Sequence, residues 1–286
     1  MKEPRTVSII DTPRQGDTAV RPLFLGEYGE RVFTLQFAPS GKIRGHIVYL
    51  PPFAEEMNRC RSAVADQARA FAARGFACTL LDFFGTGDSD GQLQDASLAR
   101  WHDNVRLVVD HLQRESAAPL LLWGLRLGGL VALDFASRRE YPVSDIILWQ
   151  PVTGAAVFVN QMLRQRIAML SMRGLPAEKT VEIRERLARG EQVEIAGYTV
   201  SGQLLEDLEA VDVAAMGSLC SGQIHWLEHV MDSDRDVGPA AARAIAVLES
   251  QGNSVAVHKF CGPQIWQVAN RESAKELTDV TSGLFE

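Results

Sequence analysis

The chain has 286 residues, 46% of them hydrophobic, with a formal net charge of −7 at pH 7 and an isoelectric point near 5.5, which suits one large α/β domain or a domain with a small insert. This acidic balance excludes nucleic acid and anionic membranes as general partners, and the absence of any run of about 18 apolar residues excludes a membrane-spanning helix. Residues 1–17 have no apolar core of signal-peptide length, so we expect a protein of the cytoplasm whose four cysteines, Cys60, Cys78, Cys220 and Cys261, are reduced thiols.

The first half of the chain alternates between apolar runs and helical patterning. In chain order it predicts an antiparallel strand pair in 21–40, a strand in 44–53, a helix in 58–76, a strand and a Gly/Asp-rich loop in 77–91, an amphipathic helix in 97–115, a strand in 118–124, a helix in 127–139 and a strand in 143–152. Nearly continuous apolar strands alternating with helices predict a mostly parallel sheet with helices on both faces, preceded by antiparallel strands.

The alternation stops after Pro151. Residues 158–191 have helical patterning without a strand between the helices. We therefore predict a helical lid insertion over 154–205, with the core formed by 1–153 and 206–286. The sheet is predicted to resume with a strand in 221–230, a helix in 238–252, a strand in 254–260 and a final helix.

A strand-to-helix turn reads Gly124-Leu125-Arg126-Leu127-Gly128. In a serine hydrolase the corresponding turn is Gly-x-Ser-x-Gly, where flanking glycines allow a strained nucleophile to stand between strand and helix. This sequence keeps the glycines and has arginine at the nucleophile position, so a serine mechanism is not expected here, because an arginine stays protonated.

Two neighbouring loops support the same fold. The loop after the strand in 44–53 corresponds to the one that supplies an oxyanion-hole N–H; Pro51 and Pro52 cannot donate, so Phe53 has the first available N–H and Leu127 would supply the second. The loop over 82–89 matches an Asp-x-x-Gly-x-Gly-x-Ser turn common in α/β-hydrolases. Three landmarks in this order predict an α/β-hydrolase fold.

The segments LPPFAEEMNRCR and GLRLGG resemble the exosortase A system-associated hydrolase 2 family. That family consists of bacterial α/β-hydrolase-like proteins encoded near exosortase and exopolysaccharide genes, and the resemblance covers most of the chain. It implies an α/β-hydrolase fold of the esterase or thioesterase kind and a role associated with those systems. A shared fold does not by itself establish activity.

The other two members of a catalytic triad are less evident. Asp232, Asp234 and Asp236 follow the strand in 221–230 and qualify as the acid, with Asp234 favoured, although each also suits a solvated loop or a helix N-cap. The loop that should carry the base, 261–265, has no histidine, and His258 precedes it in strand patterning, which favours a structural role.

His225 and His229 match a His-x-x-Glu-His pattern, which binds zinc when it lies on a helix. This segment is predicted to be a strand, where residues four apart are separated by about 13 Å. We therefore expect no metal at this pair, and no cofactor.

Arg126 at a helix N-terminus has two possible roles. A guanidinium there could hold a carboxylate or phosphate ligand in bidentate fashion, so the ligand would be small and anionic, or acyl. It could instead form an internal ion pair with Glu55, Glu56 or Asp234, because an unpaired, partly buried arginine is costly.

Three hypotheses of function follow. The first is a degenerate hydrolase that acts as a binding or accessory protein, with Arg126, Phe53, Leu127, Glu55 and Glu56 as binding residues. The second is a carboxylesterase or thioesterase with a displaced nucleophile, for which Cys60, Ser62 and Ser89 are available. The third is an interaction protein that forms a homodimer through its lid.

Overall fold

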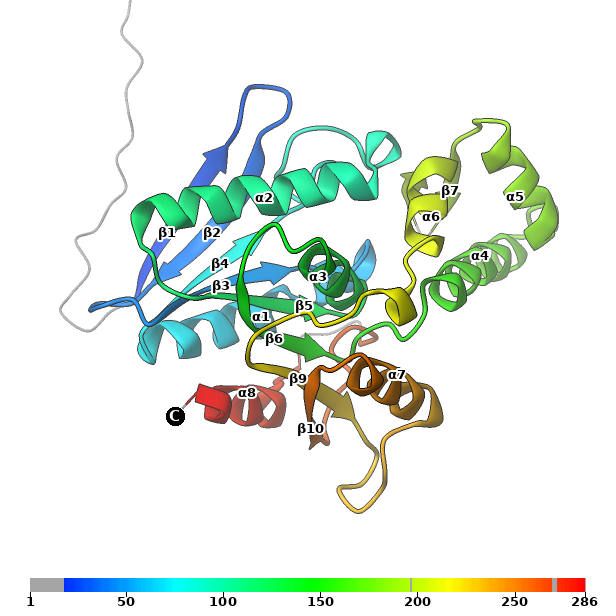
Figure 1. The fold of residues 1–286 in the computed structure, drawn as a ribbon. Helices are drawn as coiled ribbons and strands as arrows, with labels where there is room; N and C mark the ends of the chain where they lie inside the picture. Colours follow the sequence, from blue (N-terminus) through cyan, green and yellow to red (C-terminus); the bar gives the residue numbers. More distant parts are fainter. Residues whose placement is uncertain (1–17, 196, 269–271, 286) are drawn as a thin grey trace, which may run out of the picture.

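The computed structural model describes residues 18–195, 197–268 and 272–285 (Figure 1). Within these ranges an eight-stranded sheet has the order β1-β2-β4-β3-β5-β6-β9-β10. β1 and β4 each pair antiparallel with β2, and the other neighbours pair in parallel. The strands are β1 Ala19–Leu25, β2 Val32–Ala38, β3 Gly45–Leu50, β4 Phe76–Leu81, β5 Leu120–Leu125, β6 Val143–Trp149, β9 Gln223–His229 and β10 Ser254–Phe260.

Helices cover both faces of this sheet. Their bounds are α1 Glu55–Ala73, α2 Leu98–Glu115, α3 Leu127–Ser137, α7 Pro239–Ser250 and α8 Lys275–Ser282, with short 3-10 turns at Leu93–Asp95, Val213–Ala215 and Gly283–Phe285. Buried residues of α2, α3 and α7 form one apolar core, and those of α1 and α8 form the other. The central strands face both cores, which explains their continuous apolar character and confirms the predicted fold class.

The segment between β6 and β9 differs in detail from the prediction. It holds α4 Ala155–Met172, α5 Thr180–Ala188, the hairpin strands β7 Val193–Ile195 and β8 Tyr198–Val200, and α6 Gly202–Glu209. The hairpin was not expected in a helical insertion; its strands of three residues are too short to show a period in the sequence. The predicted end of the insertion, residue 205, lies inside α6.

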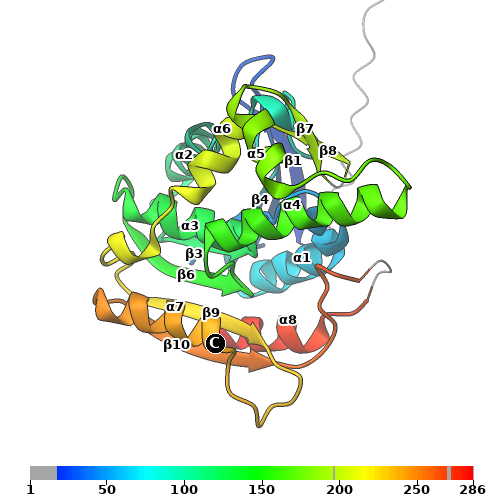
Figure 2. The same cartoon turned by 90° about the vertical axis from the view of Figure 1, so that its right-hand side faces the viewer.

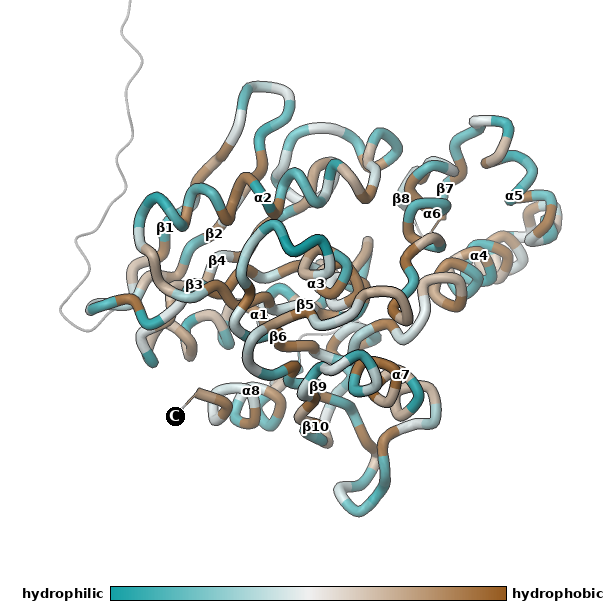
Figure 3. The backbone as a smooth tube through the Cα atoms, in the orientation of Figure 1, coloured by the Kyte–Doolittle hydropathy of each residue, from teal (hydrophilic) through white to brown (hydrophobic). Residues whose placement is uncertain are grey.

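Figures 1 and 2 show where this segment lies. It stands beyond the carboxyl ends of the central strands, and α4 lies across that edge of the sheet. Apolar residues concentrate in the strands and on the inner sides of the helices (Figure 3). None of the helices in the described ranges is both long and apolar enough to cross a membrane.

Candidate functional site

The turn between β5 and α3 has the backbone of a nucleophile elbow. Arg126 has φ 53 and ψ −118, a conformation that an L-residue rarely adopts. The turn is held by Arg126 N donating to the Trp149 carbonyl at 3.0 Å and by Gly129 N donating to the Arg126 carbonyl at 3.0 Å. A Cβ on Gly128 would stand 2.1 Å from the Leu50 carbonyl oxygen, so this position requires glycine.

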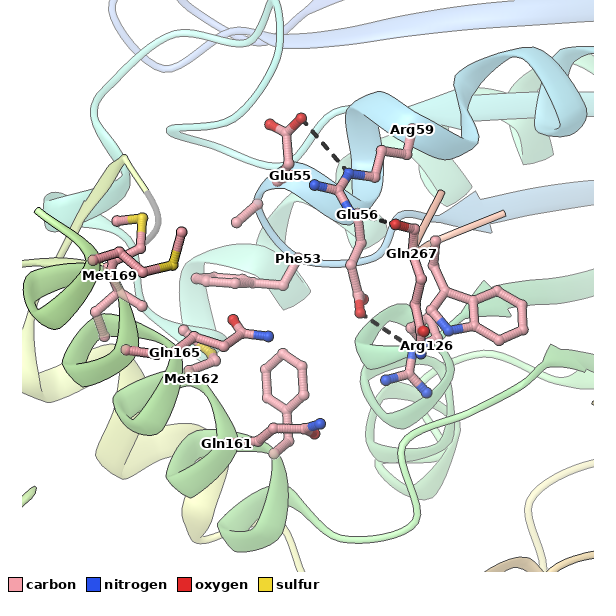
Figure 4. A pocket seen from close by; sticks show the side chains of 16 residues that line it. Phe53, Glu55, Glu56, Arg59, Arg126, Gln161, Met162, Gln165, Met169 and Gln267 are labelled. Atoms are coloured by element: carbon pink, nitrogen blue, oxygen red, sulfur yellow. Dashed lines mark hydrogen bonds and ion pairs between the residues drawn. The ribbon is translucent and has the colours of Figure 1, made fainter. Parts of the chain in front are cut away.

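The Arg126 side chain is mostly buried and has a carboxylate partner. Its Nε lies 3.4 Å from Glu56 Oε1, and its Nη1 donates to the Gln150 carbonyl at 3.3 Å. Its guanidinium carbon lies 5.6 Å from the centre of the Trp266 ring. Figure 4 shows the Glu56 and Arg126 side chains directed toward one another. Of the three acids that sequence analysis named as partners, the structure pairs Arg126 with Glu56.

Glu55 points elsewhere, although it precedes Glu56 on α1. Its carboxylate lies 3.8 Å from Arg59 Nε and accepts hydrogen bonds from Asn58 and Tyr198. Burial raises the pKa of Glu56, and Arg126 opposes this rise. The two adjacent glutamates therefore differ: one is a surface residue, and the other faces the turn with its Oε2 buried and without a hydrogen-bond partner in the described ranges.

The loop that precedes α1 is also strained. Ala54 has φ 53 and ψ −127, and the loop is closed by Glu56 N donating to the Phe53 carbonyl at 3.3 Å. Among the described residues, no acceptor is found for the amide of Phe53 or of Leu127. Both of the N–H groups that sequence analysis named as oxyanion-hole donors are thus free to serve a ligand.

A pocket of about 710 Å³ opens beside Arg126. Charged residues line one side of it, and α4 lines the other side with methionine, phenylalanine and glutamine side chains (Figure 4). The lining residues include Phe53, Glu56, Arg59, Arg126, Phe158, Gln161, Met162, Gln165, Met169, Met172, Ile195 and Trp266. Its size falls in the range of about 300–1,000 Å³ that is usual for small-molecule sites.

The aspartates predicted to supply a triad acid do not join this site. Asp232, Asp234 and Asp236 are exposed on the loop after β9, and within the described ranges none of them contacts Arg126. Asp232 caps its own loop by accepting a hydrogen bond from Asp234 N at 3.2 Å. They are therefore loop residues in this structure.

A polar group at the carboxyl ends of β6 and β9 was not predicted from the sequence. Glu228 is buried and accepts hydrogen bonds from Trp226 Nε1 at 2.8 Å and Gln150 Nε2 at 3.1 Å. Burial raises the pKa of Glu228, and these two hydrogen bonds and Arg126 oppose the rise. The available signal was position alone, because ligands of open α/β sheets bind at the carboxyl ends of the strands.

A role for His229 at this site was not predicted either; from the sequence it was considered only as a zinc ligand, and that role was not expected. Its Nδ1 lies 3.2 Å from Gln264 Nε2 and its Nε2 lies 3.0 Å from the Gly262 carbonyl. This pattern suits the tautomer with hydrogen on Nε2, and both ring nitrogens are then occupied. His229 therefore contacts the loop over 261–265, where a base would normally lie. Its acceptor nitrogen, Nδ1, is already occupied by Gln264, so it is not free to take a proton.

The alternative nucleophiles have unfavourable surroundings. Cys60 is fully buried on α1, and burial, followed by the nearby Glu56, raises the pKa of its thiol. Ser89 Oγ donates to the Asp82 carbonyl at 2.5 Å and accepts from Phe33 N at 2.8 Å, so it fixes the loop after β4. Ser62 is half-buried on the same helix as Cys60.

His225 is paired with His258 and not with His229. The segment is strand β9, as predicted, and His225 Nδ1 lies 3.4 Å from His258 Nε2 on the neighbouring strand β10. Burial lowers the pKa of both imidazoles, and His258 lowers that of His225 further. His258 is therefore a strand residue with a structural contact, as its patterning indicated.

We expect this histidine pair to make the fold sensitive to acid. In the folded protein the pKa values of His225 and His258 lie below the ordinary value of about 6.5. The contribution of the neutral pair to the free energy of unfolding is therefore fully present above about pH 6.5 and is lost as the pH falls through the folded pKa values. Thermal melts between about pH 7.5 and pH 5 should show a smaller loss of Tm in the His225→Asn/His258→Asn variant than in the wild type. His46, whose pKa burial also lowers, keeps its share in both proteins. An equal loss of Tm in the variant and the wild type would contradict this prediction.

Comparisons with known proteins agree with the fold. A model of the family described as serine aminopeptidase, S33, matches residues 41–237. Human mitochondrial palmitoyl-protein thioesterase ABHD10 is 28% identical over 148 residues, which make up 50% of this chain and 46% of that protein. The chain thus spans about half the length of the curated relatives it matches.

Solved structures extend the likeness over nearly the whole chain. A putative hydrolase from Agrobacterium vitis has a TM-score of 0.62 at 17% identity, covering 94% of this chain and 100% of that one. Est1E from Butyrivibrio proteoclasticus with bound ferulic acid has a TM-score of 0.64 at 15% identity, covering 91% and 96%. Mouse α/β hydrolase domain-containing protein 10 has a TM-score of 0.52 at 16% identity, covering 85% and 89%. Because the family model covers more than half of the chain and the fold agrees with it, the chain belongs to the serine aminopeptidase S33 family of α/β-hydrolases.

Proposed function

We propose that this protein binds a small anionic or acyl ligand on an α/β-hydrolase fold and does not hydrolyse it by a serine mechanism. The observation that carries the proposal is Arg126: it stands at the strained turn where a nucleophile would stand, and its guanidinium lines the pocket. A guanidinium cannot attack a carbonyl carbon, but it is well suited to holding a carboxylate or phosphate.

The surroundings of Arg126 support the same proposal. A serine nucleophile needs a base to take its proton, and the loop over 261–265 offers Gln264 where a histidine would serve. The acid position after β9 is held by exposed aspartates, while the buried acid, Glu228, is engaged by Trp226 and Gln150. Among the described residues, the roles of base and acid thus lack a suitably placed group, as the role of nucleophile does at Arg126.

The setting of this function rests on the sequence resemblance. Similarity to the exosortase A system-associated hydrolase 2 family supports an accessory role in a bacterial exosortase or exopolysaccharide system, acting in the cytoplasm. In this proposal residues 154–205 are the lid of the ligand site, which the pocket wall supplied by α4 supports. The lid would then select the ligand rather than exclude water from a reaction.

A second candidate is a thioesterase with a displaced nucleophile, which the name of the curated relatives favours. Cys60 is the strongest alternative nucleophile, because the positive charges of Arg126 and Arg59 nearby act to lower the pKa of its thiol. Its burial and raised pKa oppose the formation of a thiolate, so the geometry supports this candidate less well.

The purified protein is expected to show no turnover above the buffer rate with p-nitrophenyl butyrate or with an acyl-CoA thioester. Loss of a triad nucleophile or base typically reduces the rate about a millionfold. Steady-state release of p-nitrophenol or free thiol measures this directly, with Cys60→Ala and Ser62→Ala as companion variants. Clear turnover by the wild type that disappears in Cys60→Ala would overturn the proposal in favour of the displaced nucleophile.

A further inference from the structure

The ion pair between Arg126 and Glu56 engages only part of the hydrogen-bonding capacity of the guanidinium. Arginine has five N–H donors in a planar fork that matches both oxygens of a carboxylate. Here Glu56 reaches the fork through one oxygen, at 3.4 Å from Nε, and within the described part of the chain the other oxygen has no hydrogen-bond partner. No bond from Nη2 is found among the described residues. The fork therefore retains donors for a better-placed carboxylate.

The pocket beside this pair is amphipathic. Arg126, Glu56 and Arg59 lie at its polar end, and the opposite wall is rich in thioether and aromatic side chains. That wall is formed by Phe53, Phe158, Met162, Met169, Met172 and Ile195, with the amides of Gln161 and Gln165 of α4 between them. Methionines are flexible and polarizable, so such a wall adapts to an unbranched aliphatic chain.

We propose that the ligand of this pocket is an aliphatic carboxylic acid, that its carboxylate displaces Glu56 from Arg126, and that its chain lies along the methionine-rich wall of α4. Glu56 then acts as an internal competitor that occupies the guanidinium in the empty protein. This inference rests on the proposed function and adds the ligand class and the residue that competes with it.

The arrangement favours a carboxylate for three reasons. Glu56 shows that a carboxylate fits beside Arg126 in this fold. The amide of Leu127, at the first position of α3, has no acceptor among the described residues and adds a donor at the positive end of that helix. Finally, Glu56 holds Arg126 through a single long contact of 3.4 Å, and burial penalises the charged form of Glu56, raising its pKa despite Arg126 beside it and Arg59 on its own helix.

Isothermal titration with decanoate, below its micellar concentration, tests the proposal. The wild type should bind decanoate. It should bind methyl decanoate and decanol at least about tenfold more weakly, because these molecules lack the charge that pairs with Arg126. Shortening the acid from decanoate toward hexanoate should weaken binding about fourfold per methylene.

The two residues of the ion pair should have opposite effects. Arg126→Gln should weaken decanoate binding about tenfold or more, and Arg126→Lys should restore only part of it, because lysine lacks the bidentate fork. Glu56→Gln should tighten binding about tenfold by removing the competitor. Arg243→Gln and Glu249→Gln on α7 make the same charge changes outside this pocket and should shift affinity by less than about twofold. Thermal melts verify that each variant is folded.

Each outcome has one meaning. Methyl decanoate bound as tightly as decanoate, or decanoate binding unaffected by Arg126→Gln, overturns the ligand class. Unchanged or weaker binding in Glu56→Gln overturns the role of Glu56 as competitor. Turnover of p-nitrophenyl decanoate by the same wild-type samples contradicts the proposed function whatever the titrations show, whereas a lack of decanoate binding without turnover contradicts this inference alone.

Discussion

The Gly128→Ala variant is expected to lose about 3 kcal/mol or more of its free energy of unfolding. The added Cβ would stand 2.1 Å from the Leu50 carbonyl oxygen and 2.6 Å from the Pro51 carbonyl oxygen. Both atoms are backbone at the end of a central strand, so neither moves as the tip of a flexible side chain would. The overlap is relieved only by separating α3 from β3, which opens the apolar core between them.

Urea denaturation of Gly128→Ala and of a matched glycine variant measures this loss. A Cβ on Gly41 would have no heavy atom within 4 Å, and the backbone there is ordinary, so Gly41→Ala should stay within about 0.5 kcal/mol of the wild type. Equal stability of the two variants would show that α3 and β3 are free to separate. The strong requirement at Gly128 explains why the elbow keeps its glycine although the serine is gone: the close approach of helix and strand is needed by the fold itself.

The fold could be predicted from the sequence because hydrophobic patterning and the residues that end helices and strands agree along most of the chain. Apolar runs of six or seven residues marked the parallel strands, and Gly75, with φ 91, follows the end of α1, where glycine tolerates this backbone conformation. Prediction was less accurate at the start of one helix and for the shortest strands. α1 begins at Glu55 and not near residue 58, because the strained Ala54 starts the helix directly after the proline pair. The β7–β8 hairpin has no periodic signal of its own.

The site was only half predictable. Arg126 and Glu56 lie in two motifs whose relative placement is a property of the fold class, so their proximity followed from chain order. Trp266 lines the pocket from a distant segment, and Glu228 lies behind it, bonded to Gln150, whose carbonyl accepts from Arg126. The directions of these side chains depend on strand alternation and on the loop after β10. Asp234 shows the converse: its position in the sequence is right for a triad acid, but its loop turns into solvent.

Arg126→Ser restores the Gly-x-Ser-x-Gly pattern on a backbone that already has the elbow conformation, yet we expect no esterase activity from it. A serine is a poor nucleophile until a base takes its proton. His229 is the histidine next to the loop over 261–265, and both of its ring nitrogens are engaged, by Gln264 and the Gly262 carbonyl. The substitution also removes the partner of Glu56, leaving a buried carboxyl group where an oxyanion would develop.

Adding a histidine separates a missing base from a misplaced one. In Arg126→Ser/Gln264→His the new imidazole stands on the base loop and releases His229 from its hydrogen bond to Gln264. We expect weak hydrolysis of p-nitrophenyl butyrate, well below a working triad, because Asp234 is exposed and Glu228 is held by Trp226, so neither acid orients the imidazole. The Gln264→His single variant, which keeps Arg126, is the control and should stay at the buffer rate. An oxyanion hole and binding alone give about 10³–10⁴-fold over buffer. If Arg126→Ser alone turned over the ester at a rate about a millionfold above buffer, His229 would have to leave its partners and serve as the base, and the chain would then lack only its nucleophile.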